Sequence, residues 1–108
     1  MTKISDYFKG WLVGDFSPCL VNNKDIEIGI KEYKAGDSET SHYHKISTEY
    51  TIVLSGSVTM LEKEYGKGDI ITIFPNVHNK FISITDSILL VIKTPSVPKD
   101  KYIIEESL

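Results

Sequence analysis

Apolar and polar residues alternate with a period of two along much of this chain, and turn residues interrupt the alternation every few positions. Ile26, Ile28 and Ile30 alternate with Glu27 and Gly29, a pattern that predicts a half-buried strand. Runs rich in β-forming residues predict further strands over residues 11–16, 42–44, 50–54, 58–62, 70–74, 81–85 and 88–93. About seven or eight short strands at close spacing predict an all-β sandwich or barrel.

Turn residues separate these predicted strands. Glycine-containing turns are expected at 34–37, 55–57 and 65–69, and Pro75 ends the strand before it. Residues 1–12 are expected to hold one short helical turn. The C-terminal tail, residues 95–108, begins as an extended connector and carries a last apolar pair, Ile103 and Ile104.

Length and composition predict one soluble domain over residues 1–108. The chain is 41% hydrophobic and 25% charged, as is usual for a globular domain. Its longest aliphatic run, 88–92, is far shorter than the roughly 20 residues of a membrane span. The N-terminus lacks the apolar stretch of a secretory signal. The single cysteine, Cys19, excludes an internal disulfide and a cysteine-rich zinc site, so we expect a cytoplasmic protein without a membrane partner.

Charge narrows the choice of partners. All 12 basic residues are lysines and the formal net charge is −3. The lysines are scattered, whereas a nucleic-acid-binding protein usually shows a clustered basic face. Without arginine the chain also lacks the planar fork that binds phosphate groups in a bidentate manner. We therefore expect no nucleic-acid partner, and a nucleotide sugar is a disfavoured ligand.

The residues that could carry chemistry lie between Gly36 and Gly56. His42 and His44 are two apart on an extended piece, so both rings should point to one face. Glu49 opens the next predicted strand, which can fold back over the first. Two imidazoles and one carboxylate make a set of metal ligands. A buried polar cluster without a metal would use the same residues.

The spacing of these residues resembles the first motif of the cupin superfamily, as found in small single-domain proteins of its conserved-barrel type. The motif runs over 36–56, with Gly36, His42, His44, Glu49 and Gly56 at the family's usual intervals. A second cupin-like motif runs over 68–81, from a Gly-Asp turn through a proline to a phenylalanine. The resemblance implies an all-β, double-stranded β-helix (jelly-roll) barrel with a pocket between its sheets.

The second motif departs from the family pattern at its metal ligand. An ungapped alignment places Asn79 where the family has a histidine, and His78 lies one residue too early. A shift of one residue in a strand turns a side chain to the opposite face. Either His78 from the turn or Asn79 as a weak oxygen ligand could fill this position. A site with three ligands, or one that has lost its metal, is the main expectation.

Three functions fit these residues. The first is a metal-dependent enzyme, a dioxygenase or an isomerase, that binds Fe, Zn, Mn or Ni and acts on a small oxygen-rich molecule, with Glu49 as a candidate base. The second is a metal-free sugar epimerase or isomerase with His44 and Tyr33 as acid and base. The third is a module that binds a small molecule without catalysis.

Two further expectations concern the surroundings of the pocket. Tyr43 and Tyr50 alternate with the candidate ligands, so they should face away from the pocket. The family resemblance implies a homodimer. The N-terminal segment or the tail after Pro95 would be an exchanged arm, with Ile103 and Ile104 as contacts.

Overall fold

Strands make up most of the computed structural model, which describes residues 3–104. Two short 3₁₀ turns, η1 (Ile4–Asp6) and η2 (Phe8–Gly10), precede the strands. The strands are β1 (Trp11–Gly14), β2 (Val21–Asn22), β3 (Glu27–Tyr33), β4 (Ser38–Tyr43), β5 (Thr48–Ser55), β6 (Ser57–Met60), β7 (Lys63–Gly66), β8 (Ile70–Ile73), β9 (Asn79–Ser83), β10 (Ser87–Thr94) and β11 (Tyr102–Ile103). Within this part of the chain no helix is long and apolar enough to cross a membrane.

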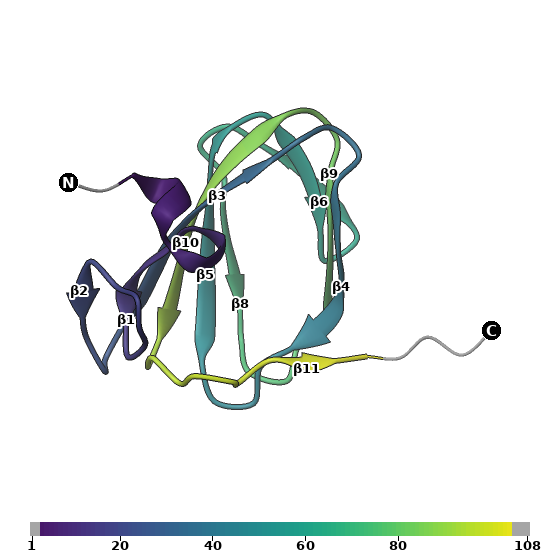
Figure 1. Ribbon diagram of the computed structural model, residues 1–108. Coiled ribbons are helices and arrows are strands. Elements are labelled where there is room, and N and C mark those ends of the chain that lie inside the picture. Colours follow the sequence, from purple (N-terminus) through teal and green to yellow (C-terminus); the bar gives the residue numbers. More distant parts are fainter. Residues whose placement is uncertain (1–2, 105–108) are drawn as a thin grey trace.

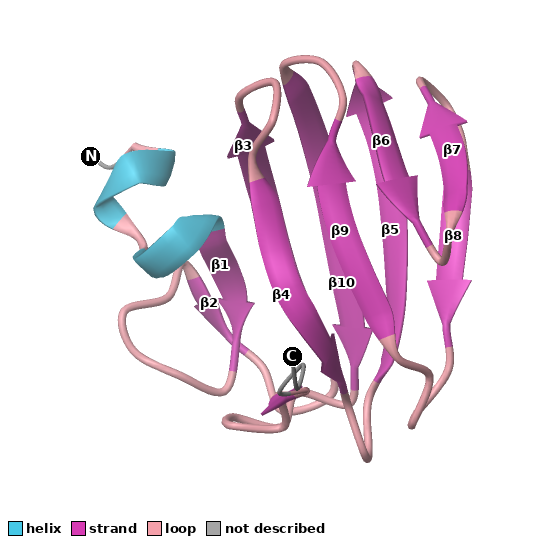
Figure 2. Ribbon diagram, turned by 90° about the vertical axis from the view of Figure 1, so that its right-hand side faces the viewer, coloured by secondary structure: helices cyan, strands magenta, loops and turns pink. Residues whose placement is uncertain are grey.

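The strands form two sheets that face each other as the walls of a barrel (Figure 1). The first sheet has six strands in the order β2-β1-β3-β10-β5-β8, and the second has five in the order β11-β4-β9-β6-β7. Figure 2 shows η1 and η2 beside the barrel, next to β1. The predicted all-β jelly-roll barrel, the double-stranded β-helix, is therefore confirmed.

The interior of the barrel is apolar at one end and polar at the other. On the inner face of the first sheet, Val53 of β5 pairs with Leu89 of β10, and both are almost fully buried. Farther along the same two strands, Glu49 pairs with Lys93, and both are also buried. The apolar end continues into the rest of the core: Val58, Met60, Ile71, Ile73, Phe81 and Val91. The polar end is where a site can form.

β3 has its apolar residues on the side opposite to the barrel interior. Glu27 and Gly29 are buried inside, and Lys31 lines the interior cavity, whereas Ile28 and Ile30 lie on the outer face. The isoleucine alternation correctly predicts a strand. The alternation does not reveal which face of β3 lies inside the barrel. The usual rule places apolar residues inside, whereas here the inner face borders a polar chamber and carries the polar residues.

The outer face of the first sheet is apolar as well. Strand register places Ile28, Ile92 and Tyr50 in one row across three strands. The next row across four strands consists of Ile30, Leu90, Ile52 and Ile70. An antiparallel sheet usually presents a polar face to water, so this apolar outer face is unusual.

Several elements differ from the expected ones. β4 is longer than the predicted piece at 42–44, and residues 63–66 form the strand β7 where part of a turn was expected. The two-residue β2 has no signal in the hydrophobic pattern. The tail pairs with its own chain: Tyr102 and Ile103 of β11 lie beside Tyr43 and His42 of β4.

Gly56 makes the sharp turn between β5 and β6 possible. Its φ is +84°, and a Cβ atom there would lie 2.3 Å from the carbonyl oxygen of Asp86. Gly36 has a similar φ of +89°, but nothing lies within 4 Å of its Cβ position. Both positions need the left-handed backbone conformation, and only Gly56 also needs the missing side chain for space.

Gly56→Ala is expected to lower the free energy of unfolding by about 2–5 kcal/mol. The left-handed backbone costs about 1–2 kcal/mol, and crowding against Asp86 adds about 1–3 kcal/mol. Gly36→Ala is the matched control and should cost about 1–2 kcal/mol. Urea denaturation measures both, and equal losses would contradict the close approach at Gly56.

Candidate metal centre

The turn between β4 and β5 brings two histidines and a glutamate together. His42 is in β4, His44 follows its end, and Glu49 is the second residue of β5. One ligand atom from each of the three lies within 4.8 Å of the others. His44 and Glu49 are buried, and His42 is half-buried. The cluster sits at the polar end of the barrel interior.

Asp100, from the segment after β10, holds the turn that carries His44. Its side-chain oxygens accept hydrogen bonds from the backbone N–H groups of Lys45, Ile46 and Ser47 at 2.9–3.0 Å. Burial alone would raise the pKa of this carboxyl, but these three donors outweigh burial and hold it below its ordinary value. The Asp100 side chain is therefore an anion that caps the turn.

The backbone of Asp100 also fixes the ring of His44. His44 Nδ1 lies at hydrogen-bond distance from the Asp100 carbonyl oxygen, which can only accept, so Nδ1 carries the proton. His44 Nε2 lies 3.3 Å from Glu49 Oε1. In neutral His44, two lone pairs would face each other across this gap. A cation between them, or a second proton on the ring, resolves the conflict.

His42 presents the same ring atom as His44. Its Nδ1 lies 3.0 Å from the carbonyl oxygen of Thr40, which again leaves Nε2 as the unprotonated nitrogen of the neutral ring. Burial is the main reason that the pKa of His42 lies below its usual value, so the ring is held neutral. A neutral imidazole with a backbone acceptor on its other nitrogen is the usual form of a histidine ligand.

Glu49 is held as a carboxylate. Burial raises its pKa, but the hydrogen bond and charge of His44 and the charge of His42, which act when those rings are protonated, and the charge of Lys93 lower the pKa more and leave it below the ordinary value. The hydroxyl of Thr51 donates to Glu49 Oε2 at 3.2 Å. Two imidazoles that turn Nε2 inward and one oriented carboxylate fit a divalent metal ion.

A small chamber of about 130 Å³ opens beside this cluster. It is much smaller than the roughly 300–1,000 Å³ of pockets for drug-sized ligands, so it suits a molecule of a few heavy atoms. Its walls mix both ends of the barrel interior: Trp11, Lys31, Tyr33, Glu39, Met60, Asn79, Phe81, Val91, Lys93 and Lys101, together with Lys9 and the three cluster residues.

Structural comparison identifies the architecture, whereas no protein-family model and no curated protein sequence matches the chain. An uncharacterized conserved protein with a double-stranded β-helix domain from Klebsiella pneumoniae superposes with a TM-score of 0.76 at 13% identity, covering 98% of this chain and 92% of that one. An RmlC-like cupin protein from Desulfovibrio desulfuricans superposes at 0.61 with 20% identity, covering 69% and 76%.

The chain has the cupin fold. A third similar structure is the DMSP lyase DddQ from Ruegeria pomeroyi, with a TM-score of 0.70 and 16% identity over 92% of this chain and 54% of that one. The resemblance of the two sequence motifs to cupin motifs therefore agrees with the architecture of the structure.

In this cupin barrel, the two residues proposed for the second-motif ligand lie on different sides. His78 is exposed and stacks on Tyr43, with ring centroids 5.0 Å apart, outside the three-residue cluster. Asn79 is buried and lines the chamber. Its Oδ1 accepts the N–H of Leu61 at 3.1 Å, so the amide NH₂ is the group it can offer to a ligand.

Of the three tyrosines discussed in the sequence analysis, Tyr43 and Tyr50 face away from the chamber and Tyr33 faces into it. Tyr43 stacks on Tyr102 as well as on His78, and Tyr50 is on the outer face, so neither lines the chamber. Tyr33 does line it, and its hydroxyl donates to Glu39 Oε1 at 3.1 Å. Burial and Glu39 raise the pKa of Tyr33 well above its ordinary value, so the hydroxyl keeps its proton.

Sequence reasoning missed several residues of this site. Asp100 had no local signal, because its partners lie more than 50 residues away. Lys93 did have a local signal in the sequence. It lies two and four residues after Val91 and Leu89 on the same strand, so it shares their inward face. Its buried amine lies 3.5 Å from Glu27 Oε1 and above the ring of Trp11.

Replacing the Asp100 carboxylate should loosen the turn below His44. Asp100→Ala is expected to lower the free energy of unfolding by about 2–4 kcal/mol, because three backbone donors lose a charged acceptor. Asp100→Asn keeps one oxygen and should recover part of the loss, and Asp25→Ala, an exposed aspartate, is the control. Chemical denaturation measures all three. An Asp100→Ala protein as stable as Asp25→Ala would contradict the role of the carboxylate.

Proposed function

We propose that this chain binds one divalent metal ion through His42, His44 and Glu49 and uses the site to bind or transform a small oxygen-rich molecule. The observation that carries the proposal is the setting of His44, whose Nδ1 meets a carbonyl oxygen and whose Nε2 meets a carboxylate. A metal ion on Nε2 and Glu49 satisfies both atoms without a charged imidazole.

The donor set suits Fe, Zn, Mn or Ni, the metals that accept imidazole together with a carboxylate. When bound, such a metal supplies a Lewis acid with open positions for oxygen atoms of a substrate. The chain supplies the other functions. The Tyr33 hydroxyl, bonded to Glu39, lines the chamber, the Asn79 amide can donate a hydrogen bond, and Thr51 orients Glu49.

The similarity to a lyase favours catalysis over simple binding. DddQ carries the name of an enzyme, DMSP lyase, so this fold can house a catalytic site. Because fold alone does not determine function, binding without turnover is the alternative. A metal-free epimerase with His44 and Tyr33 receives less support, since the Tyr33 hydroxyl is already bonded to Glu39.

Elemental analysis tests the metal site. Purified protein reconstituted in turn with Fe(II), Zn(II), Mn(II) and Ni(II) should retain about one equivalent of at least one of them after desalting. His42→Ala should lose that metal, because it removes one of only three ligands. A metal at 100 times its Kd should raise the free energy of unfolding of the wild-type chain by about 2.7 kcal/mol.

His78→Ala is the matched control for this experiment, because His78 is exposed and stacks outside the cluster. It should hold as much metal as the wild-type chain. Wild-type protein that retains none of the four metals would contradict the site. Equal metal content in the wild-type and His42→Ala proteins would contradict its ligands.

We also propose that the protein is a homodimer, with the apolar outer face of the first sheet as the contact. No charged side chain lies in the two cross-strand rows of this face described above, which consist of Ile28, Ile92 and Tyr50 and of Ile30, Leu90, Ile52 and Ile70. A second copy related by a two-fold axis can cover such a face without opposing like charges. The tail, which pairs with its own β4, is left as part of one subunit.

Light scattering measures the mass of the protein in solution and so tests the dimer. The wild-type protein should have twice the 12.2 kDa mass of the chain. Ile70→Lys, at an outward position that is 64% exposed, should give a monomer because it would bury an unpaired charge at the contact. Ile84→Lys is the control, since Ile84 is 42% exposed just after β9 of the other sheet. A monomeric wild-type protein would rule out the dimer.

A further inference from the structure

The chamber beside the histidines carries a surplus of positive charge. Four lysines line it, namely Lys9, Lys31, Lys93 and Lys101, against two glutamates, Glu39 and Glu49. With neutral histidines the lining residues have a net charge of +2, and Glu27 behind Lys93 reduces this to +1. The chain as a whole has a charge of −3. Positive charge is therefore gathered inside, against the sign of the whole molecule.

Two of these lysines are neutralised and two are not. Lys93 pairs with Glu27 at 3.5 Å, and Lys101 pairs with Glu39 at 3.6 Å. Within residues 3–104, no carboxylate lies at ion-pair distance from the amine of Lys31 or Lys9. Lys31 Nζ instead donates to the carbonyl oxygen of Lys9 and lies 4.2 Å from the ring centroid of Trp11.

Both burial and this surplus of positive charge act on the amine of Lys31. Burial is the main cause that lowers its pKa to about 8, and the charges of Lys9, Lys101 and Lys93 lower it further, while Glu39 alone opposes them. An ammonium group in such a place is stabilised by an anion. The protein itself does not supply this anion to Lys31.

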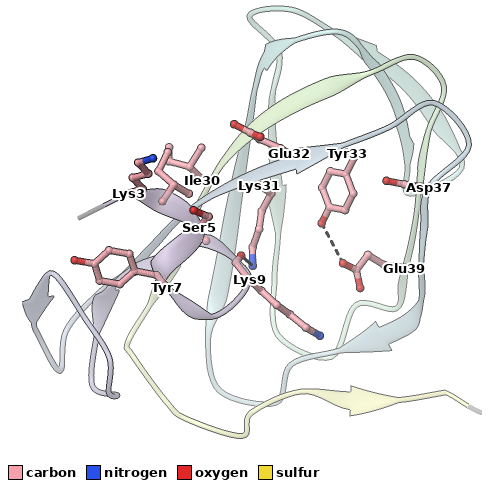
Figure 3. Close-up of a pocket in the computed structure, with 12 residues that line it drawn as sticks. Lys3, Ser5, Tyr7, Lys9, Ile30, Lys31, Glu32, Tyr33, Asp37 and Glu39 are labelled. Carbon is pink, nitrogen blue, oxygen red and sulfur yellow. Dashed lines mark hydrogen bonds between the residues drawn. The ribbon is translucent and has the colours of Figure 1, made fainter. Parts of the chain in front are cut away.

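Lys31 and Lys9 also line a wider groove that adjoins the inner chamber. This groove of about 760 Å³ runs between the N-terminal turns and strands β3 and β4, and it shares Lys9, Lys31, Tyr33 and Glu39 with the inner chamber. In Figure 3, the Lys31 side chain turns toward Lys9, and the linked pair Tyr33 and Glu39 lies to the right of these two lysines. Lys9 and Lys31 are therefore common to the open groove and to the chamber beside the histidines.

We propose that the chamber binds a small carboxylate, with its anionic group held by the amines of Lys31 and Lys9 at the mouth. The inference rests on the proposed function in one respect: the other oxygen atoms of the ligand would face the metal site of His42, His44 and Glu49. The small volume of the chamber favours a molecule of a few carbon atoms. A planar carboxylate also suits a chamber whose walls include the rings of Trp11 and Tyr33.

Trp11 makes the experiment direct, because it is the only tryptophan of the chain and it lies under Lys31. Malonate, a dicarboxylate of three carbons, is titrated into metal-free protein at constant ionic strength while tryptophan emission is followed. Malonamide, its uncharged analogue, is the ligand control. Malonate is expected to change the emission in a saturable manner, and malonamide is expected to leave it unchanged.

Three lysine variants assign the response to the site. Lys31→Met should weaken malonate binding about tenfold or more, as expected when a charged hydrogen-bond donor is removed. Lys9→Met, at an exposed position, should also weaken it and serves if Lys31→Met folds poorly. Lys63→Met, on the exposed β7, should bind malonate like the wild-type protein. Circular dichroism checks the fold of each variant.

The outcomes separate this inference from the metal site. If malonate gives no saturable change, or malonamide gives the same one, the carboxylate proposal is wrong even where metal is retained. Wild-type affinity in both Lys31→Met and Lys9→Met would overturn it as well, and so would a response to inorganic phosphate without one to malonate. A lysine-dependent malonate response in a protein that retains no metal would support the carboxylate site and overturn the metal site.

Discussion

The candidate site depends on one carboxylate, that of Asp100. The two carboxylate oxygens accept hydrogen bonds from three backbone N–H groups of the turn between β4 and β5. The backbone carbonyl oxygen of the same residue accepts a hydrogen bond from His44 Nδ1. The turn would otherwise bury donors without acceptors, which is costly. Because β4 carries His42 and β5 carries Glu49, the geometry of that turn sets how the three side chains meet.

The polar end of the barrel is possible because the buried charges of Glu27, Glu49 and Lys93 lie opposite one another at register positions. Glu27 and Lys93 face each other across β3 and β10, and Glu49 faces Lys93 across β5 and β10. Ser96 adds a hydrogen bond to Glu27. Burying an ion costs several kcal/mol unless such partners are present. The apolar end, with Val53 and Leu89, carries the hydrophobic stabilisation that a polar end lacks.

The local parts of this architecture could be predicted from the sequence, and the long-range parts could not. His42, His44 and Glu49 lie within eight positions, so their spacing and one turn were enough to group them. The sequence did not reveal which face of β3 points into the barrel. Its isoleucines look like core residues, and only the location of the chamber shows that Glu27 and Lys31 are inside. The lysines looked scattered because they come together from η2, β3, β10 and the tail.

The distance in sequence between His44 and Asp100 has a consequence for biosynthesis. A ribosome makes His42, His44 and Glu49 about midway through the chain, and it adds Asp100 some 50 residues later. Until then, the nascent chain has the side chains that can hold a metal but not the clamp that orients them. In the proposed metal site, the ring of His44 is therefore oriented only after residue 100 has been added, and a fragment that stops before residue 100 lacks the carboxylate and the carbonyl oxygen that hold it.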